Sequence, residues 1–135
     1  MMGWLSATPD KRNETRYKDY VNRNHGPPPM PEIEFGEHVI GYLQEVGPAL
    51  NTGQGLVPLT FSEIEAWMRM VGVALTSWEA SMLKRLSDEY VAEHHAARKP
   101  QHPQPWTPIQ GFDKEAIAKG MRGLLGKISA KRDKK

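Results

Sequence analysis

The sequence predicts a small all-α domain built on a central helical hairpin, with proline-rich linkers and amphipathic helices at its edges. Three observations support this class. Thr60 with Glu63, and Thr76 with Glu79, each match the capping-box pattern that starts a helix, about sixteen residues apart. Apolar residues recur at helical spacing through most of the chain. We find no alternating pattern that indicates a strand. The 135 residues suit one domain with tails.

Residues 1–30 are expected to form an N-terminal arm. Thr8, Pro9 and Asp10 combine a cap, a proline and an acid in the order typical of a helix start, which predicts a short helix over residues 10–23. The proline-rich stretch at 26–31 cannot be helical and is read as an extended linker. Trp4 has no local apolar partners, so it is either exposed or docked on another element.

Residues 31–98 are expected to form a three-helix core. The first helix should open at Pro31, with three glutamates near its positive end, and stop at Gly47-Pro48. Residues 51–55 have the composition of a flexible loop. The apolar stripe of this first helix consists of Phe35, Val39, Tyr42, Leu43 and Val46.

The helical hairpin follows the loop. Its first helix starts at Thr60 and ends at Gly72, and Leu59 and Ile64 are spaced as a hydrophobic staple. Its second helix starts at Thr76 and must stop before Pro100. We interpret Trp67 and Trp78 as core anchors. The residues expected to define the hairpin are Leu59, Thr60, Glu63, Ile64, Trp67, Thr76, Trp78, Glu79, Leu86 and Tyr90.

The C-terminal third is expected to hold a linker over residues 99–111 and a basic amphipathic helix over 112–135. Three glycines inside that helix each cost about 1 kcal/mol relative to alanine, so the segment should order on a partner or dock loosely. Residues 101–135 hold eight basic and three acidic side chains, a net +5, against +2 for the whole chain. The hypothesised partner-binding residues are Trp106, Ile117, Met121, Leu124, Leu125 and Ile128.

This basic stripe has several interpretations: a protein groove, a nucleic acid or a membrane surface. The glycines and the lack of aromatics within the stripe argue against a membrane. The hairpin could also be a helix-turn-helix, but Trp78 and Glu79 stand where such a motif needs groups that bind bases and phosphates. Ordinary hairpin packing is therefore favoured, and nucleic acid is the less favoured partner.

Neither a catalytic site, a metal site nor a cofactor is expected. The chain has no cysteine and no phosphate-binding or nucleophile motif, and its five histidines lack the spacing of a metal site. They are interpreted as solvated residues at helix ends. No apolar run approaches a membrane span, and the first residues do not resemble a signal peptide. These observations favour a soluble, intracellular protein that is not an enzyme.

Residues 38–92 carry a family resemblance. Residues 58–67 read PLTFSEIEAW, followed by Trp78-Glu79 and then by LSDEY at 86–90. This order of segments resembles small proteins of tailed phages that serve as tail assembly chaperones. The match covers about two fifths of the chain and consists of caps and core residues, so it marks a fold more firmly than an activity.

The resemblance implies a non-catalytic role in virion morphogenesis in the host cytoplasm. It implies binding to the tape measure protein and help in recruiting the tail tube protein, with self-association left open. Two alternatives remain: a small nucleic-acid-binding or regulatory protein that uses the basic tail, and a minor structural component of the virion tail.

Overall fold

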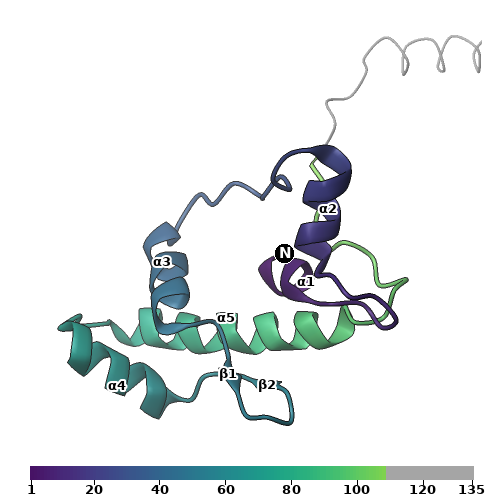
Figure 1. Ribbon diagram of the computed structural model, residues 1–135. Coiled ribbons are helices and arrows are strands. Elements are labelled where there is room, and N and C mark those ends of the chain that lie inside the picture. Colours follow the sequence, from purple (N-terminus) through teal and green to yellow (C-terminus); the bar gives the residue numbers. More distant parts are fainter. Residues whose placement is uncertain (109–135) are drawn as a thin grey trace, which may run out of the picture.

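One long helix organises the fold in the computed structural model, which describes residues 1–108. This helix is α5. Helices α3 and α4 pack beside its N-terminal half, α1 packs beside its C-terminal half, and α2 packs on α1 (Figure 1). A two-stranded antiparallel hairpin follows α3, with Leu50 paired to Val57. The bounds are α1 Met2–Ser6, α2 Arg16–Asn24, α3 Glu37–Val46, β1 Leu50–Asn51, β2 Leu56–Val57, α4 Phe61–Val71 and α5 Ser77–Ala96.

The main core joins α3, α4 and α5, which confirms the predicted mostly helical domain. The staple residues Leu59 and Ile64 are both in it, each 1% exposed. Half-buried apolar side chains such as Trp67 and Leu86 pack around its edge. The fully enclosed members are Val39, Leu43, Leu59, Ile64 and Leu83.

Both predicted helix starts of the hairpin are confirmed. The Thr76 hydroxyl accepts from the Glu79 N–H, and the Glu79 carboxylate accepts from the Thr76 N–H at 2.7 Å, so this box is complete. Thr60 makes only the first of these bonds, accepting from the Glu63 N–H at 3.2 Å. Gly72 ends α4 with φ +71°, a left-handed geometry that glycine adopts without strain.

Helix α1 was not expected, and it packs directly on α5. A Cβ atom on Gly3 would lie 2.3 Å from the Tyr90 carbonyl oxygen, so the two backbones approach as closely as glycine permits. The Ser6 hydroxyl lies 2.9 Å from Nδ1 of His94. The fully buried Ala97 and the nearly buried Leu5 and Val91 give this end its own small apolar interior.

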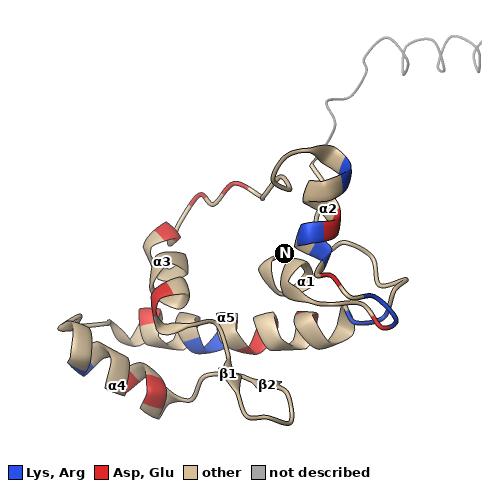
Figure 2. Ribbon diagram, in the orientation of Figure 1, with Lys and Arg blue, Asp and Glu red and all other residues tan. Residues whose placement is uncertain are grey.

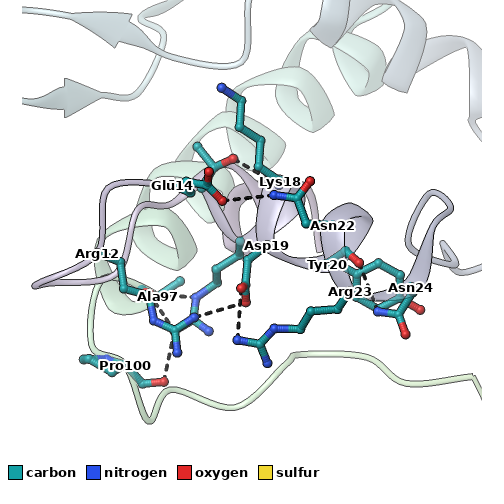
Figure 3. Close-up of polar contacts among 12 residues, drawn as sticks. Arg12, Glu14, Lys18, Asp19, Tyr20, Asn22, Arg23, Asn24, Ala97 and Pro100 are labelled. Atoms are coloured by element: carbon teal, nitrogen blue, oxygen red, sulfur yellow. Dashed lines mark hydrogen bonds and ion pairs between the residues drawn. The ribbon is translucent and has the colours of Figure 1, made fainter.

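Arg16, the first residue of α2, caps the end of α5. Its guanidinium donates to the Ala97 carbonyl at 2.8 and 3.0 Å and to the Lys99 carbonyl at 2.8 Å. It also lies 4.4 Å from the ring centre of Trp4, so Trp4 is docked within the domain. One turn after Arg16 on α2, the Asp19 carboxylate accepts from Arg12 and Arg23 at 3.1 and 3.0 Å (Figure 3).

Three boundaries differ from the sequence prediction. The helix predicted from residue 10 starts at Arg16, capped by Thr15, because Asp10 instead donates its backbone N–H to Arg98 within a tight turn. The helix predicted to open at Pro31 starts at Glu37, after Gly36 with φ +76°. The loop at 51–55 is the tip of the β-hairpin, whose two-residue strands are too short to show alternation.

Candidate partner-binding surface

Large apolar side chains are exposed where α3 and α5 begin. Phe35, placed by the sequence on the buried stripe of its helix, is 89% exposed, because α3 starts two residues after it. Trp78, predicted to be a core anchor, is 55% exposed. Ile33 on the approaching linker is 46% exposed. Exposed aromatics grouped in this way are typical of surfaces that bind partners.

The two aromatic residues flank the same glycine. Trp78 Cη2 would lie 3.6 Å from a Cβ atom on Gly36, so the indole ring rests beside the backbone that follows Phe35. We call Ile33, Phe35 and Trp78 the aromatic patch. The exposed Met70 and Val71 end α4 at the same end of the domain (Figure 1), 88% and 43% accessible.

Polar contacts fix the backbone under the patch. Nε2 of His38 lies 2.9 Å from Oε1 of Glu79, which joins the first turns of α3 and α5. The pKa of Glu79 lies below its ordinary value, chiefly because its carboxylate accepts from the Thr76 backbone N–H, then from the Thr76 hydroxyl and from His38. The patch is therefore carried on two anchored helix starts.

The patch has an acidic border. Glu32, Glu34 and Glu37 are exposed and alternate with or follow its residues along the chain (Figure 2). The only cation-forming neighbour on the first turn of α3 is His38, which is engaged by Glu79. An apolar surface with this border favours a partner segment that presents apolar side chains next to lysine or arginine.

Helical geometry explains why Trp78 is outside the core. The buried residues of α5 are Leu83, Ser87 and Val91, four apart and hence on one stripe. Trp78 lies five residues before Leu83, about 140° around the helix from it at roughly 100° per residue. The sequence predicts an apolar stripe of Trp78, Met82, Leu83, Leu86 and Tyr90 for this helix. Leu83 is buried as predicted, but a pattern of apolar residues overlooks the buried Ser87.

The remaining predicted hairpin residues lie in or against the packed interior, or cap its helices. Trp67 packs on the core edge, 5.5 Å from the ring centre of Tyr42, and its Nε1 is buried without an acceptor among residues 1–108. Tyr90 is half-buried under α1. Of the predicted partner-binding residues, Trp106 is half-buried, and Ile117, Met121, Leu124, Leu125 and Ile128 lie outside the described residues.

Four of the five histidines make side-chain contacts with other parts of the chain, which differs from the solvated role expected for them, whereas His25 is exposed at the end of α2 as expected. His95 Nε2 lies 3.0 Å from the Leu56 carbonyl oxygen, and His102 Nε2 lies 3.0 Å from Glu93. Within residues 1–108, no group of three or more His, Cys, Asp or Glu side chains is arranged to hold a metal ion. In that same part of the chain, no helix is long and apolar enough to cross a membrane.

Comparison with known protein families, with curated proteins and with solved structures found no match to this chain.

Proposed function

We propose that this protein is a non-catalytic tail assembly chaperone of a tailed phage, which binds the tape measure protein in the host cytoplasm and helps the tail tube assemble around it. The observation that supports this most is the aromatic patch with its acidic border. The resemblance of residues 38–92 to such chaperones gives the client.

The chemistry of the patch suits a helical client. A tape measure segment would lay one apolar face across Phe35 and Trp78 while its lysines and arginines meet the glutamates at the border. Aromatic side chains dominate binding energy at such interfaces. The contact is small, so each one is reversible, and many copies along one client would keep it soluble until tube subunits replace them.

The C-terminal stripe is the second contact in this proposal. Ile117, Met121, Leu124, Leu125 and Ile128 provide an apolar face for the client or for another copy, and Trp106 precedes them. A segment that orders on binding loses entropy at that moment, which favours release. Leu124→Glu combined with Leu125→Glu should therefore reduce client recovery while the hairpin stays folded.

The test is co-expression of the full chain with the tape measure and tail tube proteins of its phage, followed by affinity purification and mass spectrometry. We expect recovery of the tape measure protein with the wild type, and strongly reduced recovery with Phe35→Ser plus Trp78→Ser. Phe61→Ser is the matched control, because Phe61 is 58% exposed at the opposite end of α4.

Two outcomes would redirect the assignment. Recovery of nucleic acid alone, in a complex lost at moderate salt, would favour the basic-tail alternative. Persistence of the protein in purified virions would favour a structural role in the tail.

A further inference from the structure

A cleft of about 480 Å³ lies at the other end of the domain from the aromatic patch. Its walls are the turn between α1 and α2, the tip of the β-hairpin and the last turns of α5. This volume is within the range of small-ligand sites. The charged and imidazole side chains that line it are Asp10, Lys11, Arg12, His94, His95 and Arg98.

The lining is cationic. Three permanent cations and one carboxylate line the cleft. Figure 2 marks basic positions in blue on the loop between α1 and α2, near the end of α5. The carboxylate of Asp10 lies 3.4 Å from Arg98, and Arg12 pairs with Asp19 outside the cleft lining. Lys11 has no polar partner among residues 1–108 and is exposed.

The backbone places Lys11 in this cleft at an energetic cost. The Arg12 N–H donates to the Pro9 carbonyl at 3.0 Å, and the Asp10 N–H donates to the Arg98 carbonyl at 2.8 Å, so the turn is bonded to the segment that follows α5. Lys11 is the third residue of that turn with φ +67°, a position that favours glycine. A lysine held where glycine would relieve strain indicates a use for its charge.

The helix end that faces the cleft does not repel an anion. The C-terminal end of α5 carries partial negative charge, but Arg16 donates to the carbonyls of Ala97 and Lys99, which follow the helix directly. His94 Nδ1 lies 2.9 Å from the Ser6 hydroxyl, which itself donates to the Gly3 carbonyl, and His95 Nε2 donates to the Leu56 carbonyl at 3.0 Å. In the neutral form, each ring therefore has its N–H engaged, and the donors for an anion are Lys11, Arg12 and Arg98. Burial first, and then the charges of His95 and Arg98, lower the pKa of His94, which favours its uncharged ring.

We propose that this cleft binds a small phosphate-bearing molecule, with Lys11, Arg12 and Arg98 contacting the phosphate oxygens. One guanidinium group can donate two parallel N–H bonds to a phosphate group, and a lysine ammonium adds a point charge. Asp10 is the one group lining the cleft that opposes the anion, and its pairing with Arg98 reduces that effect. This proposal goes beyond the chaperone function and does not depend on it.

The probe is inorganic pyrophosphate, titrated into the full chain by calorimetry at constant ionic strength. We expect saturable binding that Lys11→Gly and Arg98→Gln each weaken at least fivefold, and that Lys11→Arg retains. Arg69→Gln is the control, because Arg69 pairs with Glu65 on α4, away from the cleft. Lys11→Gly should melt at an equal or higher temperature, because it relieves the strained turn, so its lost binding cannot be unfolding.

Binding of a single-stranded oligonucleotide distinguishes the two sources of phosphate, which are a small molecule and the backbone of a nucleic acid. If pyrophosphate competes with the oligonucleotide, and if Lys11→Gly weakens the binding of both ligands by the same factor, the cleft is supported as the shared phosphate site. Absence of saturable pyrophosphate binding to the wild type, or unchanged affinity in Lys11→Gly and Arg98→Gln, would overturn the proposal. So would oligonucleotide binding that pyrophosphate does not compete with, since that indicates a diffuse basic surface.

Discussion

The hydroxyl of Ser87, in the middle of α5, accepts a 2.8 Å hydrogen bond from the backbone N–H of Leu59. The same hydroxyl donates to the Pro48 carbonyl at 2.8 Å. One fully buried oxygen thus satisfies the chain on both sides of the β-hairpin, where it leaves α3 and where it enters α4. This junction sets the position of the core staple residue Leu59.

Ser87→Ala should destabilise the domain by about 1–3 kcal/mol, because it leaves the buried Leu59 N–H and the partly buried Pro48 carbonyl without partners. The free energy of unfolding from urea denaturation checks this. Ser81→Ala on the exposed face of α5 is the control and should change stability little. Equal stability of the two variants would mean that Ser87 does not hold the junction.

Gly3→Ala should detach α1 from α5. A methyl group would meet the Tyr90 carbonyl oxygen at 2.3 Å, and both helix backbones would have to move. We expect a loss of about 1–3 kcal/mol, the range for overpacking a close contact. Gly41→Ala in α3 meets nothing within 4 Å and should stabilise by about 0.5–1 kcal/mol instead. If α1 packs as described, the melting temperature falls in Gly3→Ala and rises in Gly41→Ala.

Arg16→Lys should not be conservative. Lysine cannot bridge the Ala97 and Lys99 carbonyls with one planar group or stack equally on Trp4. We expect destabilisation by about 1–2 kcal/mol and a change in Trp4 fluorescence at lower denaturant than in the wild type. Arg23→Lys, whose exposed side chain only pairs with Asp19, serves as the comparison. If both variants unfold alike, Arg16 does not cap α5.

The ionisation of Glu79 makes the stability of the domain depend on pH. Its pKa is lowered from the ordinary value of 4.5 by the Thr76 bonds and by His38, so the folded state favours the carboxylate. The contribution of Glu79 to the free energy of unfolding is complete above the ordinary pKa, which applies to the unfolded chain. It is lost as the pH falls through the lowered pKa of the folded state. The melting temperature of Glu79→Gln should be below that of the wild type at pH 6 and approach it at pH 3. A constant difference across this range would contradict the assignment.

The sequence predicted those parts of the fold that are controlled locally. Thr60 and Thr76 start their helices as expected, because a cap needs only residues within one turn. Leu59 and Ile64 also reached the core as predicted. Thr8 does not start a helix, because the backbone N–H of Asp10 donates to the carbonyl of Arg98, and residues 9–12 form a turn instead. That competition comes from tertiary contact and leaves no local pattern.

The surface was harder to predict than the core. Phe35 and Trp78 match the helical period in the sequence, yet both are exposed, because α3 begins late and α5 buries the stripe of Ser87. Apolar periodicity cannot separate a core aromatic from one presented to a partner. The cleft was missed because Lys11 and Arg12 are more than 80 positions from Arg98 in the sequence, and they meet only when α1 packs on α5.

The most direct test of the central claim is a solubility measurement. The tape measure protein is expressed alone, with the full wild-type chain, with the Phe35→Ser plus Trp78→Ser variant, and with Phe61→Ser. We predict that the wild type and Phe61→Ser keep the tape measure protein in the soluble fraction, and that the double variant, still folded by circular dichroism, does not. Equal rescue by the double variant, or no rescue by the wild type, would contradict the account.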